Sequence, residues 1–116
     1  MIWLYLAGLT MAGTAILHSW AGEKRLIAPI LAIDHPVTRR TLARKVTRFA
    51  WHFTTVLMLL SAAAVVWPGM PRGFIGITGM AWLAVGLFDG VYTRGKHIGW
   101  LPLSLAGLFA LLGVYL

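Results

Sequence analysis

Four apolar runs of 18 to 21 residues dominate this sequence and limit what it can fold into. An α-helix rises about 1.5 Å per residue, so about 20 residues cross the ~30 Å hydrocarbon core of a bilayer. Helices also satisfy their own backbone hydrogen bonds, which lipid cannot do. We therefore expect an all-α integral membrane protein with spans at about residues 2–22, 49–67, 73–90 and 99–116.

Composition supports a membrane location and leaves no room for a second domain. The chain has 116 residues, of which 59% are hydrophobic and 11% charged, and its mean hydropathy is +0.82. A soluble domain of this size is not so apolar. We expect a single domain, residues 1–116, folded as an antiparallel four-helix bundle. No basic segment precedes Ile2, so the first run is expected to be a retained span rather than a cleaved leader.

The segment between the first two spans, residues 23–48, is expected to be a basic, partly helical loop. Its apolar stretch Leu26–Ile33 is too short to cross a bilayer and is expected to lie at the interface as a lid. Pro36 is typical of the first turn of a helix, so the second helix is expected to begin near it as a basic stub. The apolar positions of this stub recur at helical spacing, at Leu42, Val46 and Phe49.

The distribution of basic residues predicts orientation. Seven of the ten Lys and Arg residues lie in the loop of residues 23–48, two lie between the third and fourth spans, and one lies between the second and third. The positive-inside rule then makes the 23–48 loop cytoplasmic and both termini periplasmic in a multi-pass protein of the bacterial inner membrane. The net charge of +7 is therefore assigned to membrane lipids rather than nucleic acid, with headgroup or partner contacts expected at Arg39, Arg40, Arg44, Lys45 and Arg48.

Small residues recur at helical spacing along three of the spans. Such stripes let helix backbones approach closely in lipid and favour a compact bundle, a homo-oligomer or assembly into a larger membrane complex. The stripes are Gly8, Ala12, Ala15, Ser19 and Gly22; Gly76, Gly79, Leu83, Gly86 and Gly90; and Gly99, Leu103, Ala106, Ala110 and Gly113.

The polar residues that can carry chemistry lie toward the cytoplasmic half. His18 lies five residues inside Glu23, and His52 lies four residues inside Arg48, so both imidazoles are expected about one helical turn below the same membrane face. Ionisable groups inside a membrane are costly and tend to face the interior or to pair. There is no cysteine, which excludes thiolate sites. The acids and histidines of this half are Glu23, Asp34, Asp89, His18, His35, His52 and His97.

Three chemistries suit such a layer, and the sequence leaves them open. A metal ion, Zn, Fe or Mn, is the first, and haem b held by His18 and His52 is the second. The third is a proton or quinone site, in which His and Asp relay protons to a lipid-soluble carrier. The expected function is a binding or accessory subunit, whose metal ligands would be His18, Glu23, His52, Asp89 and His97.

Other interpretations of the same residues are a small-solute or proton transporter that acts as an oligomer, and a structural subunit of a larger complex. In a purely structural interpretation, His18 hydrogen-bonds to a neighbouring helix, and His52 and His97 sit among headgroups. Glu23 and Asp89 then pair with nearby Lys or Arg residues. His35, beside Pro36, is expected to be only a helix-start residue.

Three strings in the first half of the chain carry a resemblance. HSWAGE begins at His18, LIAP begins at Leu26, and RFAWHFTT begins at Arg48. Together they resemble an HSxxGE…RxxWH pattern of small bacterial inner-membrane proteins. The resemblance implies a bacterial inner-membrane setting and brings no activity or ligand with it.

Overall fold

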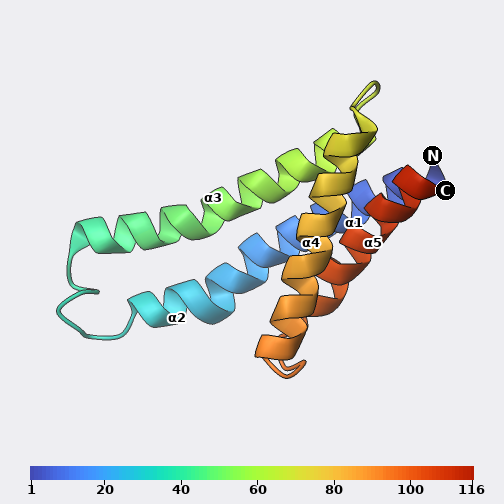
Figure 1. Cartoon of the computed structure of the whole chain (residues 1–116). Coiled ribbons are helices and arrows are strands. Elements are labelled where there is room, and N and C mark those ends of the chain that lie inside the picture. The colour runs from blue at the N-terminus through green and yellow to red at the C-terminus, as the bar shows by residue number, and fades with distance from the viewer.

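The computed structural model describes residues 1–116 and contains helices and no strands (Figure 1). Three of its helical segments are long and apolar enough to cross a membrane, which confirms the prediction of membrane-suited helices. The helices are α1 (Ile2–Gly22), a π-helical segment (Glu23–Ile27), α2 (Ala28–Leu31), α3 (Thr41–Val66), α4 (Arg72–Tyr92) and the shorter α5 (Trp100–Tyr115).

The first helix does not end at Gly22. It continues through the π-helical segment and α2, so that Ile2–Leu31 is one helical run of 30 residues. Pro29 lacks an N–H and its ring crowds the carbonyl one turn earlier, which breaks a regular α-helix. The wider π turn accommodates it, because the Ala28 N–H reaches back to the Glu23 carbonyl. The prediction that Leu26–Ile33 forms a lid is therefore wrong. Most of that stretch extends the first helix.

The second long helix, α3, begins at Thr41 and not near Pro36. The residues between α2 and α3 form turns instead, in which the Arg39 N–H donates to the His35 carbonyl at 2.9 Å. The Thr38 hydroxyl donates to the carbonyls of Ile33 and His35, which fixes the turn. The expected basic stub is helical from Thr41 onward, and α3 continues from it without interruption.

By their contacts the helices follow the order α3, α1, α5, α4. In Figure 1, α4 crosses in front of α1 and lies beside α5. α1 packs on both α3 and α5, and α5 packs on α4, whereas α3 and α4 touch very little. The two chain ends lie side by side, because Leu4 of α1 meets Gly113 of α5. The molecule is flat, with extents of 52 × 30 × 19 Å.

Small residues make the closest helix contacts, as the stripes predicted, although not at every position. A side chain at Gly8 would meet Val66 and the Ala62 carbonyl of α3. Gly79 lies against Gly107 and Ala110 of α5. Gly107, which the predicted stripes omitted, lies against the backbone of α4. The buried apolar core fills the space between these contacts, with Ala7, Met11, Ala62, Val65, Ile75, Trp82, Ala106, Ala110 and Val114.

The glycines of the α4–α5 contact provide a test of this packing. In Gly107→Ala the new methyl group would lie within 2.8 Å of the Leu83 Cα, so we expect a loss of about 1–3 kcal/mol in unfolding free energy. Gly76→Ala on α4 is the matched control, because nothing lies within 4 Å of its added Cβ. There the better helix propensity of alanine leaves stability unchanged or raises it by up to about 1 kcal/mol. Unfolding in detergent micelles measures both, and equal stability of the two variants would contradict the packing described.

Candidate functional site

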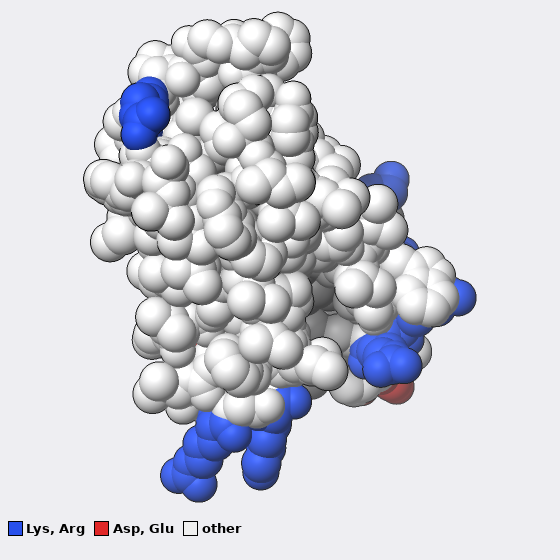
Figure 2. Space-filling view, turned by 90° about the vertical axis from the view of Figure 1, so that its right-hand side faces the viewer, with Lys and Arg blue, Asp and Glu red and all other residues white.

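One face of the molecule carries almost no charge. Figure 2 shows a face on which Lys and Arg side chains appear only near the edges and the centre is uncharged.

All three acids lie in ion pairs, Asp34 with Arg39, Glu23 with Arg48 and His52, and Asp89 with His97. The pairs of Glu23 and Asp89 involve residues of the predicted layer, and they lie at different places in the fold.

The centre of the site is a chain of polar contacts between α1 and α3. The Ser19 hydroxyl lies 2.5 Å from His52 Nδ1, and His52 Nε2 lies 3.1 Å from Glu23 Oε2. Arg48 Nε donates to the other Glu23 oxygen at 2.7 Å. His52 therefore has a partner on each ring nitrogen, and Glu23 is held by a guanidinium on its far side.

Helix geometry explains why these residues meet. Ser19 and Glu23 are four residues apart on the first helical run, and Arg48 and His52 are four residues apart on α3, so each pair lies on one helix face. The two helices run in opposite directions here, which sets Glu23 opposite Arg48 and Ser19 opposite His52. The side chains are partly buried, with exposed fractions of 29% for Glu23, 37% for His52 and 45% for Arg48.

His18 takes part in a different contact. Its ring stacks on the Trp51 indole with centroids 4.1 Å apart and an interplanar angle of 12°. His18 Nε2 lies 3.3 Å from the Trp51 carbonyl, and Trp51 Nε1 donates to the His18 carbonyl at 2.9 Å. Gly22 makes room for the indole, because any Cβ there would overlap it. This contact with the neighbouring helix is the one that the structural interpretation of His18 predicted.

A groove of about 440 Å³ runs along this junction. Thr55 is 8% exposed and its hydroxyl has no hydrogen-bond partner. A helical threonine commonly bonds to the carbonyl four residues earlier, but here that carbonyl belongs to Trp51 and is engaged by His18. The residues that line the groove are Ile16, Ser19, Trp20, Glu23, Lys24, His52 and Thr55.

The groove changes from charged to apolar along its length. Glu23 and Lys24 lie at the end nearer the basic loop, and the Lys24 ammonium lies 4.5 Å from the centroid of the Trp20 ring. Toward the N-terminus of α1, about two turns before Glu23, Ile16 is 62% exposed. Trp20, one turn before Lys24, is 57% exposed. The buried hydroxyl of Thr55 therefore lies beside exposed apolar side chains at one end of the groove.

Asp89 and His97 form a second, separate contact at the connection between α4 and α5. His97 Nδ1 lies 2.6 Å from Asp89 Oδ2, and the His97 side chain is 62% exposed. The Thr93 hydroxyl donates to the Asp89 carbonyl at 2.7 Å and accepts from the His97 N–H. The pairing of Asp89 with a lysine or arginine, expected in the structural interpretation, is replaced by this histidine contact.

The five predicted metal ligands divide into these groups. Glu23 and His52 touch one another, Asp89 and His97 touch one another, and His18 faces Trp51. No group of three or more His, Cys, Asp or Glu residues is close enough to hold a metal ion. The metal site and the haem site stay predictions, each with fewer than three of the predicted donors in one place.

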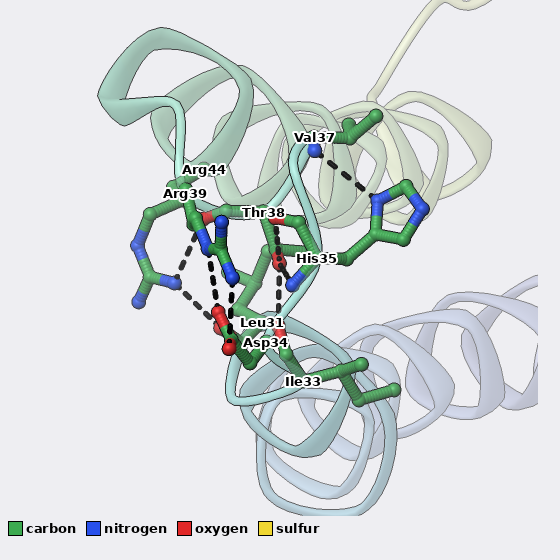
Figure 3. Close-up of polar contacts among 8 residues, drawn as sticks. All are labelled: Leu31, Ile33, Asp34, His35, Val37, Thr38, Arg39 and Arg44. Carbon is green, nitrogen blue, oxygen red and sulfur yellow. Dashed lines mark hydrogen bonds and ion pairs between the residues drawn. The ribbon is translucent and has the colours of Figure 1, made fainter.

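The turn between α2 and α3 is held by its own polar contacts (Figure 3). Arg39 donates to both Asp34 oxygens, at 2.6 and 2.9 Å, and this guanidinium holds the pKa of the Asp34 carboxyl below its usual range. His35 Nδ1 accepts from the Val37 N–H at 3.1 Å, so His35 is a local turn residue. Arg44 donates to the Leu31 carbonyl at 2.5 Å and to the Thr38 carbonyl at 3.3 Å.

Sequence reasoning missed two residues of the groove as binding groups. Ser19 was expected only as a member of a small-residue stripe, and Thr55 was not among the candidate site residues. The signal was present in their spacing. Ser19 lies four residues before Glu23, and Thr55 lies three residues after His52, so each shares a helix face with a titratable group.

Comparisons of the chain with protein-family models, with curated proteins and with solved structures find no match. The function of the chain is therefore inferred from the chemistry of the groove between α1 and α3.

The Asp34–Arg39 pair gives a prediction on pH. A carboxyl with a lowered pKa in the folded chain adds stability above its unfolded pKa, and this contribution is lost as the pH falls through the folded pKa. In Arg39→Gln we expect the pKa of Asp34 to rise toward its ordinary value, because the donating guanidinium is gone. Carboxyl NMR titration measures it, and Arg40→Gln is the control, since the Asp34 bonds come from Arg39. An Asp34 pKa that is the same in Arg39→Gln as in the wild type would contradict the contact.

Proposed function

We propose that this chain is a multi-pass protein of the bacterial inner membrane, with four spans in an antiparallel bundle. Three segments of membrane-spanning length and the apolar α5 support this proposal. At 16 residues, α5 is short for a ~30 Å core, and local thinning of the bilayer accommodates such a mismatch. The basic segment around α2 and the start of α3 is cytoplasmic, and both termini are periplasmic.

Within this setting we propose that the groove binds the polar head of a lipid-soluble carbonyl compound of the quinone class and holds a proton relay beside it. The relay would supply or remove protons when a redox partner subunit supplies the two electrons that reduce the quinone, or accepts those released by the quinol. The chain then acts as a binding or accessory subunit. The observation that carries the proposal is the buried Thr55 hydroxyl, which has no partner and belongs to a residue that lines the same groove as His52 and Glu23. A small rotation of the Thr55 side chain would turn this hydroxyl toward the groove. A buried hydroxyl without a hydrogen bond costs free energy, and a ligand carbonyl that accepts from it removes this cost.

The polar chain supplies the proton chemistry of the proposal. Imidazole is the side chain that most readily gains and loses a proton near neutral pH. His52 connects Ser19 to Glu23 through its two ring nitrogens, so a proton taken up at one nitrogen can leave from the other. Arg48 keeps the Glu23 carboxylate in place beside His52. A ligand head beside Thr55 would lie next to this relay.

The shape of the groove supports a ligand that enters from lipid. Ile16 and Trp20 are exposed beside it, and they offer an apolar and an aromatic surface to a ring or an isoprenoid-like chain. The charged end, at Glu23 and Lys24, faces the basic loop and water. An amphipathic ligand of the quinone class matches both ends.

A second candidate is a metal ion held at the Glu23–His52 contact. One specific observation favours it: Ser19 lies on the His52 nitrogen remote from Glu23, as an orienting partner does behind a metal-bound imidazole. Two protein donors would leave the other positions to water. Haem between His18 and His52 would require His18 to leave its stacking contact with Trp51.

The main proposal is tested by binding of a water-soluble short-chain benzoquinone to the purified protein, followed by tryptophan fluorescence quenching. We expect Thr55→Val to weaken binding about three- to tenfold, which corresponds to one hydrogen bond. Thr54→Val is the matched control, because its hydroxyl is exposed and bonds to the Ala50 carbonyl of its own helix. His52→Ala is expected to reduce binding and to remove its pH dependence, whereas His97→Ala leaves both unchanged.

Equal affinity of wild type, Thr55→Val and Thr54→Val would rule out the proposed role of the groove. Elemental analysis and a visible absorption spectrum of the same preparations address the second candidate. A stoichiometric metal or a Soret band that His52→Ala removes would move the assignment to metal or haem. A colourless, metal-free wild type that binds the benzoquinone would support the first.

The topology is tested with single cysteines, because the chain contains none of its own. We expect Trp67→Cys and Leu116→Cys to react with a membrane-impermeant maleimide in intact cells with a permeabilised outer membrane, since both positions are exposed at the proposed periplasmic end. Val37→Cys and Ile98→Cys are also exposed and are expected to react only after the inner membrane is opened. The reverse labelling pattern would refute the proposed orientation.

A further inference from the structure

The charges of the chain do not balance within the fold. The carboxylate of Asp34 pairs with Arg39 and that of Glu23 pairs with Arg48, and the carboxylate of Asp89 contacts His97. Since the chain has ten Lys and Arg residues and three acids, most of its cations have no carboxylate partner. The structure therefore leaves a concentrated positive charge that something outside the chain must compensate.

The densest part of this charge lies along one face of α3. Residues at spacings of three and four share a helix face, and here four of them are polar or cationic and the fifth is aromatic. They line a groove of about 320 Å³ that is distinct from the groove at His52. The lining residues are Thr41, Arg44, Lys45, Arg48 and Phe49.

Local electrostatics make this arrangement costly for the isolated chain. Arg44 and Arg48 are like charges four residues apart, which destabilises a helix. No acid lies in the first turn of α3, and Arg40 stands at its N-cap, where the helix dipole favours a negative group. Only Glu23, which pairs with Arg48, brings a negative charge to this face.

Two of the basic side chains are fixed in place before any ligand arrives. Arg44 is tied to the carbonyls of Leu31 and Thr38 (Figure 3), and Arg48 is tied to Glu23. Neutral carbonyls satisfy some N–H donors of Arg44 without neutralising its charge. Lys45 lies between the two arginines in sequence and is exposed. The groove is thus a preformed cationic site with a flexible ammonium at its edge.

Apolar surface continues from the same face toward the membrane. Phe49 and Phe53 stack with ring centroids 5.6 Å apart, and their exposed fractions are 67% and 46%. A free anion would make no use of this aromatic pair. A phospholipid places its phosphate among the cations and its acyl chain along the rings, which matches the order of these groups along α3.

We propose that the groove lined by Thr41, Arg44, Lys45, Arg48 and Phe49 binds the headgroup phosphate of an anionic phospholipid of the cytoplasmic leaflet. Its acyl chain lies along Phe49 and Phe53. The two grooves are lined by different residues, and the proposed ligand groove lies deeper along α1 and α3. They adjoin at one ion pair, because Arg48 of this groove contacts Glu23 of the other. Of the five basic residues expected from sequence to contact headgroups, Arg39 is not part of this site, because it is paired with Asp34.

The experiment compares the protein in nanodiscs of phosphatidylcholine with and without phosphatidylglycerol, and measures lipid retained after transfer to detergent by native mass spectrometry. We expect phosphatidylglycerol to be retained by the wild type and its affinity to fall about fivefold in Lys45→Gln, the effect of one basic residue near a membrane surface. Arg72→Gln removes the same charge at the other end of the molecule and is expected to leave retention unchanged.

Further measurements separate the lipid from other sources of the same chemistry. Phe49→Ala is expected to reduce retention of long-chain phosphatidylglycerol more than that of a short-chain form. Equal losses in Lys45→Gln and Arg72→Gln would overturn the site, since only net charge would matter. Displacement of the lipid by millimolar inorganic phosphate would overturn the role of the acyl chain. His52→Ala is expected to retain phosphatidylglycerol fully, so failure of the quinone proposal leaves this one standing.

Discussion

The contact between α1 and α3 is the interaction on which the rest of the structure depends. In a lipid setting no hydrophobic force draws helices together, so close approach and polar contacts must hold them. Gly8 lets α3 approach the periplasmic end of α1 as proposed here, and Gly22 makes room for Trp51 at the other end. Ser19 and His52 face one another between these contacts, and Glu23 and Arg48 meet just beyond Gly22, so the glycines and the site belong to the same packing arrangement.

The helical class and the positions of the apolar segments could be predicted from sequence, because the length of an apolar segment must match the thickness of the membrane. The residues at which two of the helices begin or end could not be predicted. The first span was expected to end at Gly22, yet a single wider turn keeps the helix continuous to Leu31, and such a turn has no sequence signature of its own. Pro36 predicts a start, but the bonds of Thr38 and Arg39 stabilise a turn before Thr41.

The candidate site was predictable in its residue types and not in its pairings. Histidines and acids at one end of the chain were evident, and depth along each helix placed His18 and His52 at one level. Which way each ring turns depends on helix rotation, which sequence periodicity does not fix when most positions are apolar. The His18 ring stacks on Trp51 and contacts its carbonyl, and the Thr55 hydroxyl one turn further along α3 has no partner. Neither arrangement has a signature in the spacing of the residues.

The π-helical segment has a consequence for how the chain could change shape. A π turn holds one residue more than an α turn, so its conversion to regular helix would rotate everything beyond it by about 100° about the axis. Ile27 and Leu31 would leave their buried positions, and the Leu31 carbonyl would turn away from Arg44. The segment starts at Glu23, so a change in the partners of that carboxylate acts at the point where such a rotation would begin. Glu23, whose carboxylate contacts Arg48 and His52 of α3, is the first residue of this segment.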